Sequence, residues 1–452
     1  ILSTQGLQFW LMSLMSIGMY AVILLNLLGT KMAGGNLGIL MVWVVWLFAL
    51  VVLLVPLLGR AWCTVCPIPM AGDALQRGTT VGVRTGKTGI TNNAYYGLNR
   101  RWPRFLSGVV PRTISFLCFG TISVLVISQP RWTGWALVLL LGLGTLLPLV
   151  FEHRAFCRFL CPINSFISLY ARMGRIGLRA KQQSFCNHCV KQDIVTCERG
   201  NQHGWACPYG LAVNEIEDNA ECGLCMECLR SCHYTNISIY WRKFELDRLL
   251  RGSGEALQAS VMLTLAIAYA ILFQGPWYGL RDMVDLVDKK NWGLFAYYAV
   301  TLWVIALVLV PLVIRGLAAL GGRIAAAREP LAILYPRTAS SLVPMGLFLW
   351  IAFAIPMLQT QGSFILSTLS DPFGWGWNLF GTAGYPWIQL WPESIPWIQS
   401  AMVLLGFAFA LSTAYRAWSV SAAGPRRALR GVLPIGAFLF LLSAGMLWFF
   451  TA

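Results

Sequence analysis

The chain has 452 residues, of which 57% are apolar and only 12% are charged. Soluble domains carry roughly 25% charged residues, so this composition excludes an ordinary soluble enzyme and a disordered tail. Apolar runs of about 20 residues, the length that crosses the hydrocarbon of a bilayer, recur along the chain. The formal net charge of +16 would suit nucleic acid only if the basic residues formed a patch unrelated to a membrane. The sequence therefore predicts a mainly α, polytopic membrane bundle.

The apolar runs predict nine membrane-spanning helices. They are expected near residues 9–28, 37–59, 106–128, 132–151, 256–275, 293–314, 341–358, 397–418 and 431–451. Threading the chain through alternate faces places 28 of the 34 Lys and Arg residues on one side. Because cytoplasmic loops retain positive charge, that side is expected to face the cytoplasm of a bacterial inner membrane and to contact anionic lipid. This accounts for the net charge without nucleic acid.

Three segments are predicted along the chain: a four-helix membrane repeat over 1–162, a cytoplasmic two-cluster segment over 163–255, and a five-helix membrane domain over 256–452. Arginines flank residues 163–178, which are expected to form an amphipathic helix lying in the membrane interface. The loop 359–396 is rich in tryptophan and has no Lys or Arg, which fits either an interfacial aromatic belt or a docking platform for an external partner. The chain opens without an initiator methionine, so residues before Ile1 are expected to be missing or processed.

Twelve of the thirteen cysteines fall within residues 63–66 and 157–232, a bunching that indicates metal binding. The run from Cys222 to Cys232 has the Cys-x2-Cys-x2-Cys-x3-Cys spacing of bacterial ferredoxins, in which three thiolates bind one cubane and the fourth binds the neighbouring one. The first [4Fe–4S] cluster would take Cys207, Cys222, Cys225 and Cys228, and the second would take Cys186, Cys189, Cys197 and Cys232. Cys197 is the least regular ligand because wide gaps flank it. Tetrahedral zinc is the alternative, and disulfides are disfavoured in a reducing cytoplasm.

A second signal is an internal repeat. The turn Arg60-Ala-Trp-Cys63-x2-Cys66-Pro67 matches Arg154-Ala-Phe-Cys157-x3-Cys161-Pro162, and each follows a predicted span that contains a proline. Four thiolates from two symmetric turns predict a third iron–sulfur site at the membrane surface. The same spacing also suits structural cysteines at helix ends, which are often buried.

Other redox groups are constrained by what the sequence lacks. No histidine lies in a predicted span and no Cys-x2-Cys-His occurs, so haem is not expected in this chain. Electrons would then move through iron–sulfur clusters, a quinone or another subunit. Candidates for proton chemistry at a quinone are Arg112, Glu152 and His153, whose alternative roles are interfacial anchors and snorkelling charges.

The paired Cys-x2/3-Cys-Pro turns followed by the two-cluster run resemble the membrane ferredoxin-type proteins of the NapH and NosR group, which accompany periplasmic nitrate reductase, nitrous oxide reductase and methylamine dehydrogenase. The resemblance covers about residues 1–255 and implies a quinone-linked oxidoreductase that moves electrons between the quinone pool and a redox partner. Residues 256–452 depart from it.

Several functions remain open at this stage. The partner could be a cytoplasmic redox protein, or a periplasmic cytochrome or reductase that receives electrons from quinol in a respiratory or photosynthetic chain. A redox-sensing transporter or a complex anchor is the alternative from a different class, although the spans contain few of the acidic residues that mark transport routes.

Overall fold

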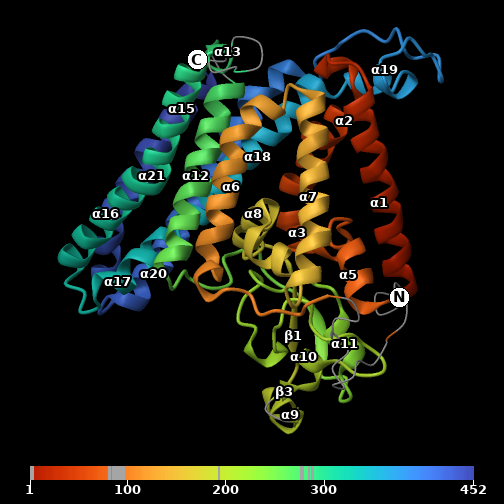
Figure 1. Cartoon of the computed structure of the whole chain (residues 1–452). Helices are drawn as coiled ribbons and strands as arrows, with labels where there is room; N and C mark the ends of the chain where they lie inside the picture. The colour runs from red at the N-terminus through yellow and green to blue at the C-terminus, as the bar shows by residue number, and fades with distance from the viewer. Residues whose placement is uncertain are drawn as a thin grey trace. The chain divides into compact units, whose positions relative to one another are not determined.

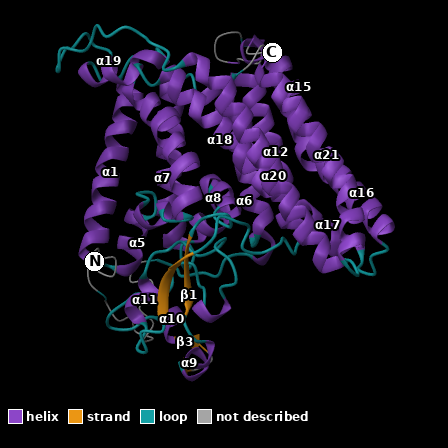
Figure 2. Ribbon diagram, turned by 180° about the vertical axis from the view of Figure 1, so that it is seen from behind, coloured by secondary structure: helices purple, strands orange, loops and turns teal. Residues whose placement is uncertain are grey.

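The computed structural model describes residues 5–79, 83, 97–191, 194–274, 279–283, 286 and 290–451. Helices predominate in this part of the chain, and its short strands pair into two two-stranded sheets (Figure 2). Within the described residues, nine helical segments are long and apolar enough to cross a membrane. They are Gly6–Leu28, Leu37–Leu58, Val109–Val126, Pro130–Val150, Ser253–Phe273, Trp292–Ala325, Leu331–Gln361, Pro392–Ser421 and Pro425–Thr451 (Figure 1). The mainly α, polytopic prediction is confirmed.

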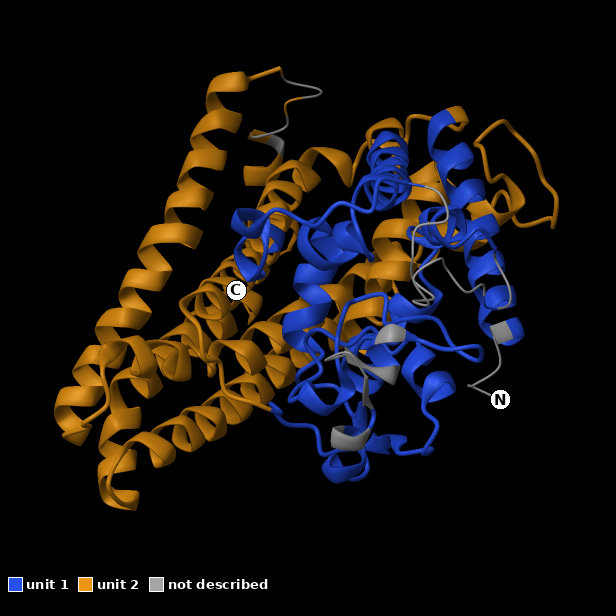
Figure 3. Ribbon diagram, turned by 60° about the horizontal axis from the view of Figure 1, so that its bottom comes forward, with its two compact units in different colours: residues 1–27, 53–112, 133–247 blue, residues 28–52, 113–132, 248–452 orange. Residues whose placement is uncertain are grey.

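Two compact units interleave along the chain (Figure 3). Unit 1 comprises residues 1–27, 53–112 and 133–247, and unit 2 comprises residues 28–52, 113–132 and 248–452. All twelve cysteines of the predicted metal sites lie in unit 1. The division into three consecutive segments stays a prediction.

Unit 1 combines membrane-type helices with short helices near the cysteine turns. They are α1 (Gln5–Leu28), α3 (Val55–Leu58), α4 (Trp62–Val65), α5 (Met70–Arg77), η4 (Arg104–Leu106), α7 (Pro130–Val150), the π-helical η5 (Phe156–Leu160) and α8 (Pro162–Tyr170). Glycines permit the close approach of α5 to α7. A Cβ on Gly72 would lie 2.5 Å from the carbonyl oxygen of Gly144, and one on Gly144 would lie 2.5 Å from Ile68 Cγ2. Larger residues at either position would push α5, and with it the first cysteine turn, away from α7.

The cysteine-rich part of unit 1 is built on an antiparallel pair of strands, β1 (Ile176–Ala180) and β4 (Ile237–Trp241). The remaining elements are α9 (Gln183–His188), β2 (Val190–Lys191), β3 (Ile194–Val195), α10 (Thr196–Arg199), η6 (Val213–Glu215) and α11 (Glu227–Ser231). Leu178 and Ile237 from the strands bury against Val213, Leu224 and Met226. This small core fixes the segments that carry the cysteines, because each of these core residues lies within eight residues of a cysteine.

The predicted interfacial helix over 163–178 is wrong. Helix α8 ends at Tyr170, and the chain continues into β1. All residues of α8 except Ile163 are buried, including the polar side that would have faced headgroups. Ser165 and Ser168 can be buried because small hydroxyls bond to nearby backbone carbonyls, as Ser168 does to the oxygen of Ser165 at 3.2 Å.

Basic residues flanking the cysteine segment were predicted to bind anionic lipid, but two of them are held by carboxylates of the segment itself. Arg172, 2% exposed, lies 3.5 Å from Asp218, and Arg242 lies 3.3 Å from Asp247. A buried guanidinium without a partner would be costly. The acidic residues therefore neutralise part of the basic stem within unit 1.

Asp247 gives this region a specific pH dependence. Burial raises the pKa of its carboxyl to about 6, with Arg242 lowering it and Asp218 raising it. The folded chain then binds a proton more tightly than the unfolded chain, so this group's contribution to stability is present below about pH 4 and is lost as the pH rises to about 6. We expect Asp247→Asn to flatten the fall in thermal unfolding midpoint between pH 4 and pH 6 in detergent. An unchanged slope in the variant would show that Asp247 ionises normally.

Unit 2 is helical in its described part. Its elements include η1 (Ala33–Gly35), α2 (Leu37–Ile39), the π-helical η2 (Leu40–Trp46) and η3 (Ala49–Leu54), α6 (Val109–Val126), α12 (Ser253–Phe273), α13 (Gly279–Met283), α15 (Trp292–Val304), the π-helical η7 (Ile305–Leu309), α16 (Val310–Ala325), α17 (Leu331–Ala339), α18 (Leu342–Gln361), α19 (Phe364–Ser370), η8 (Pro392–Ser394), α20 (Ile395–Ser421) and α21 (Pro425–Thr451). Helix α18 is the most buried and packs against α12 and α20. Its Trp350 donates a hydrogen bond from Nε1 to the carbonyl of Met262 at 3.2 Å and contacts the ring of Tyr269.

The tryptophan-rich loop of unit 2 is exposed. Asp371 caps it by accepting hydrogen bonds from the backbone N–H groups of Trp375 and Gly376, at 2.9 and 2.7 Å. The rings of Phe373 and Trp375 stack with centroids 4.4 Å apart. Trp391 is 76% exposed. An aromatic belt and a docking platform both remain predictions for this loop.

Candidate iron–sulfur sites

The two repeated turns bring four thiols together. Cys63 and Cys66 lie on and directly after α4, and Cys157 and Cys161 lie on and directly after η5. All four line one cavity, which we call the turn site. Proline follows the last cysteine of each pair, and Pro162 occupies the first position of α8, where its missing N–H costs nothing. The internal repeat in the sequence thus becomes two similar turns that face one cavity.

The surroundings of the turn site are apolar with one nearby cation. Ile68 and Phe156 are 4% and 1% exposed and pack against its cysteines. Arg60, itself 1% exposed, places Nη2 at 3.9 Å from the sulfur of Cys63. Burial raises the pKa of the Cys161 thiol to about 12. Thiolates here therefore need compensating positive charge, which bound iron and Arg60 would supply.

The second group of cysteines, Cys207, Cys222, Cys225 and Cys228, we call the loop site. Burial is the largest cause that raises the pKa of Cys228, and the neighbouring Cys225, Cys222, Cys207 and Cys197 raise it further, so Cys228 lies close to its three predicted partners and also to Cys197 of the third group. Leu224 and Met226, between these cysteines, have positive φ angles of 52° and 63°. Positive φ angles bend the backbone sharply between successive cysteines, and three ligands of one cubane need such a tightly bent loop.

Backbone N–H groups point at the loop-site sulfurs. Burial raises the pKa of Cys207 to about 11, while hydrogen bonds from the backbone of Leu211 and Tyr209 lower it. The backbone of Glu227 likewise bonds to Cys225. Hydrogen bonds to sulfur and exclusion of solvent are the protein's means of setting the potential of an iron–sulfur group.

The third group, Cys186, Cys189, Cys197 and Cys232, lines a cavity that we call the surface site. Asn236 organises it: its backbone N–H lies 3.3 Å from the sulfur of Cys232, and its Nδ2 lies 3.5 Å from that of Cys186. The rings of Phe185 and Tyr234 stack beside this cavity with centroids 5.8 Å apart, and both are partly exposed. Cys197, the least regular ligand by spacing, lines the same cavity as the other three.

The turn site and the loop site are joined by direct contacts. Thr64, between Cys63 and Cys66, donates hydrogen bonds from Oγ1 to the carbonyls of Gly223 and Leu224, at 3.0 and 2.9 Å. Tyr209 lines the turn-site cavity although it lies only two residues from Cys207. Tyr209 thus connects the turn-site cavity to Cys207, a predicted ligand of the loop site.

Gly223 is expected to be intolerant of a side chain. A Cβ at this position would lie 2.3 Å from Cε2 of the buried Tyr209 ring. Because Tyr209 also has the guanidinium of Arg60 over its face, with 5.2 Å between the guanidinium carbon and the ring centroid, it cannot shift freely. We expect Gly223→Ala to lower the iron retained by the purified protein. Gly252→Ala, where a Cβ meets nothing within 4 Å, is the matched control and should retain iron at the level of the unchanged protein.

The loop site and the surface site are also adjacent. The backbone N–H of Cys207 bonds to the carbonyl of Glu198 at 3.2 Å, and Glu198 follows Cys197 in α10. Helix α10 packs against α11, which carries Cys228. The three cysteine groups therefore follow one another through unit 1 in the order turn site, loop site, surface site.

The donor sets fit iron–sulfur groups. Four cysteines line each of two cavities, and Cys228 of the loop site has Cys207, Cys222 and Cys225 among its neighbours. No group of three or more His, Cys, Asp or Glu side chains among the described residues is arranged to hold a single metal ion. The predicted assignment of each cysteine to a particular cluster stays a prediction, and the structure gathers the turn-site set and the surface-site set around one cavity each.

The predicted quinone residues do not gather around a cavity of this kind. Arg112, 2% exposed, forms an ion pair with Glu221 at 2.8 Å. His153 has a positive φ of 56°, and its carbonyl accepts a hydrogen bond from Gln76 Nε2 at 3.4 Å. Neither they nor Glu152 line the turn-site or surface-site cavity. Their role at a quinone stays a prediction without support from this geometry.

Sequence reasoning missed the charged and aromatic groups around the turn site. Arg154 binds Asp73 through Nε, at 3.1 and 3.0 Å from the two carboxylate oxygens. Arg60 and Arg154 both lie over the ring of Tyr209. The signal was present, because an arginine stands three residues before the first cysteine in each copy of the repeat.

Comparison with known proteins bears on the same residues. The family model Fer4_5, described as a 4Fe-4S binding domain, matches residues 39–90 and 133–181. These two segments contain all four cysteines of the turn site and end before Cys186. The chain carries a 4Fe–4S binding domain of ferredoxin type. The family match therefore supports iron–sulfur binding at the pairs Cys63/Cys66 and Cys157/Cys161, whose role the sequence left open.

Three curated proteins are similar over part of the chain. Two are uncharacterized proteins of Methanocaldococcus jannaschii, 33% identical over 96 and 82 residues, which cover 21% and 18% of this chain and 32% and 29% of theirs. The third is the methylamine utilization ferredoxin-type protein MauN of Paracoccus denitrificans, 28% identical over 138 residues, or 29% of this chain and 46% of MauN. The chain thus spans less than half the length of each. No solved structure matches it.

Proposed function

We propose that this chain is a membrane-bound electron-transfer protein that links the quinone pool with a redox partner through [4Fe–4S] groups. The observation that carries the proposal is the continuous series of three four-cysteine sites within unit 1. A lone site could be structural, as zinc sites often are. Three adjoining sites, buried at one end and partly exposed at the other, suit a path for electrons.

The residues have distinct roles in this proposal. Each [4Fe–4S] group, when bound, takes up and releases one electron. The cysteines hold the groups, and Ile68 and Phe156 exclude water from the turn site. Arg60 stabilises negative charge on Cys63, and the N–H groups that meet Cys207 do so at the loop site. Phe185 and Tyr234 beside the surface site are exposed, so a soluble partner could contact the protein there.

A quinone suits one end of such a path because it carries two electrons. Oxidation of a quinol releases two electrons and two protons, so two one-electron transfers to the partner complete each turnover. The NapH and NosR resemblance supports this pairing, as does the likeness to MauN, whose name describes a ferredoxin-type protein. In this proposal the partner that exchanges electrons at the surface site is a soluble redox protein.

We place the cysteine sites on the cytoplasmic side of a bacterial inner membrane. The excess of Lys and Arg in the segments on that side of the predicted topology supports this. Reporter fusions at residues 330 and 380, which lie in loops predicted on opposite sides, would test it. A cytoplasmic reporter active only at 330 is expected, and activity only at 380 would reverse the orientation.

The direct test supplies reductant from each side separately. The anaerobically purified protein is mixed with a short-chain quinol, and in a second experiment with reduced ferredoxin, and bleaching of iron–sulfur absorbance is followed. We expect the quinol and the reduced ferredoxin each to exchange electrons with the protein. If the iron–sulfur absorbance bleaches with dithionite but with neither a ubiquinol nor a menaquinol analogue, the quinone link is contradicted.

A further inference from the structure

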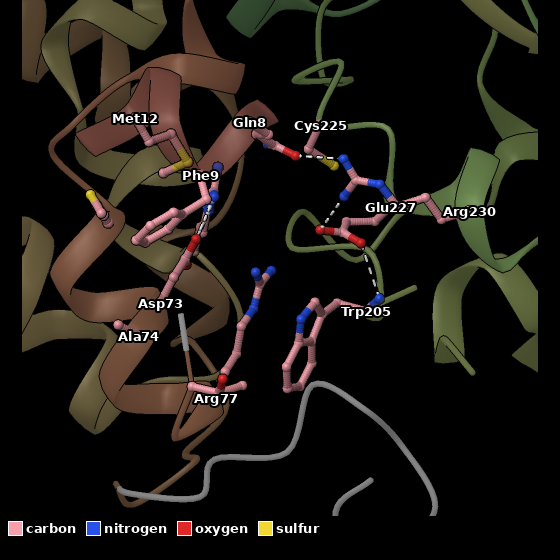
Figure 4. Close-up of a pocket in the computed structure, with 13 residues that line it drawn as sticks. Gln8, Phe9, Met12, Asp73, Ala74, Arg77, Trp205, Cys225, Glu227 and Arg230 are labelled. Atoms are coloured by element: carbon pink, nitrogen blue, oxygen red, sulfur yellow. Dashed lines mark hydrogen bonds and ion pairs between the residues drawn. The ribbon is translucent and has the colours of Figure 1, made fainter. Parts of the chain in front are cut away.

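A separate pocket opens in unit 1 beside the loop site (Figure 4). One wall is apolar and is formed by Phe9 and Met12 of α1 and Met70 of α5. The opposite wall is the indole of Trp205, which is 4% exposed. Phe9 and Met12 belong to the candidate membrane span Gly6–Leu28, so the pocket lies against a segment that would contact lipid.

The pocket reaches an iron ligand. Cys225 of the loop site is one of its lining residues. A molecule bound there would touch a cysteine that holds a cluster in our proposal, with no chain between them.

Two arginines supply hydrogen-bond donors. The guanidinium of Arg77 extends toward the space between Asp73 and Glu227, with its carbon 5.0 Å from the centroid of the Trp205 ring (Figure 4). Arg154 also lines the pocket, is 3% exposed, and has an Nη1 with no hydrogen-bond partner among the described residues. Buried donors without partners are costly, and a ligand oxygen would relieve that cost.

The remaining charges are already paired. Glu227 lies 3.0 Å from Arg230 and accepts a hydrogen bond from the backbone N–H of Trp205 at 3.1 Å. Arg230 also donates to Gln8 Oε1 at 2.7 Å. These contacts tie α1 to the loop site and close one side of the pocket. Asp73 and Glu227 offset two of the three arginines that line the pocket, so the lining keeps one positive charge, which a ligand with hydrogen-bond-accepting oxygens would face.

We propose that this pocket binds the headgroup of a quinone. A quinone is flat, uncharged and apolar on its faces, which suits the indole and thioether walls. Its carbonyl oxygens accept hydrogen bonds, which Arg77 and Arg154 can donate. A phospholipid headgroup would also bind arginine, but contact with Cys225 and the aromatic wall favour the quinone. This inference rests on the proposed function and names the site at which it operates.

Two neighbouring residues of α5 provide a matched test. Ala74 lines the pocket, whereas Leu75 does not and is 40% exposed. Binding of a short-chain azidoquinone to the detergent-solubilised protein is measured by equilibrium dialysis and then by photolabelling and peptide mapping. We expect Ala74→Trp to weaken binding by about tenfold or more by filling the pocket, and Leu75→Trp to leave it unchanged. The label should map to residues of α1, α5 or the segment around Trp205.

A second variant guards against misfolding of the first. Arg77→Gln keeps the volume of the side chain's base and removes the cation, and it should weaken binding while iron content and helical circular dichroism stay at the level of the unchanged protein. Equal binding by Ala74→Trp, Arg77→Gln and Leu75→Trp would overturn the pocket assignment. So would a label confined to other segments, although the proposed function would survive that result. A pocket that binds phosphatidylglycerol vesicles but not the azidoquinone would be a lipid site. Absence of quinone binding anywhere would contradict the proposed function itself.

Discussion

Replacing Cys157 with serine is expected to lower the iron content of the purified protein by about four atoms per chain. Cys157 lines the turn site with Cys63, Cys66 and Cys161, and a cubane that loses one of four thiolate ligands is poorly held. The loss should be selective, because the loop and surface sites have their own cysteines. Iron and acid-labile sulfide measured on anaerobic preparations would report it.

The matched control is Cys118→Ser. Cys118 lies in α6 of unit 2 and lines neither the turn-site nor the surface-site cavity, so its replacement should leave iron unchanged. Cys225→Ser provides a complementary case, since it should remove the signal of the loop site and leave the turn site intact. If Cys157→Ser retains all its iron and all its paramagnetic signals, the turn-site cysteines are structural.

Replacing Asp73 with asparagine is expected to destabilise unit 1 by about 3–5 kcal/mol. Burial acts to raise the pKa of Asp73, but Arg154 and Arg77 together lower it below its ordinary value. The carboxylate is thus ionised and neutralises Arg154, which is 3% exposed. Without Asp73, the guanidinium of Arg154 would remain buried beside the turn site with its main partner removed. Thermal unfolding in detergent would measure the loss.

A partly exposed ion pair in unit 2 serves as the comparison. Glu329 lies 2.5 Å from Arg337, but their side chains are 29% and 23% exposed. Pairs in contact with solvent contribute about 0–1 kcal/mol, so Glu329→Gln should change the unfolding midpoint little. The lowered pKa of Asp73 also sets the pH window: its stabilisation is present above about pH 4 and is lost as the pH falls further. Equal destabilisation by Asp73→Asn and Glu329→Gln would show that burial does not increase the contribution of the Asp73–Arg154 pair to stability.

Much of the architecture is determined by local pattern and could be predicted. Apolar runs of sufficient length predict spanning helices because no other use of such runs satisfies the backbone in lipid. The ferredoxin spacing grouped Cys186, Cys189, Cys197 and Cys232, and these four line one cavity, although their assignment to a cluster stays a prediction. The internal repeat pointed to the turn site in advance, and its two halves do face one cavity.

What could not be predicted depends on partners distant in the sequence. The pattern over 163–178 is amphipathic, yet α8 is buried because other parts of unit 1 cover its polar side, which periodicity does not reveal. The arginines flanking the cysteine segment look equally free in the sequence, but Arg172 and Arg242 find carboxylates within unit 1. The pocket beside Cys225 is assembled from α1, α5 and the loop site, three stretches with no shared motif.

The proposed electron path depends most directly on inorganic sulfide being present. Acid-labile sulfide and iron should be quantified on the intact, anaerobically purified chain, with zinc measured on the same sample. Three occupied sites predict about twelve iron and twelve sulfide per chain and negligible zinc. A preparation that contains zinc and no sulfide would contradict the account.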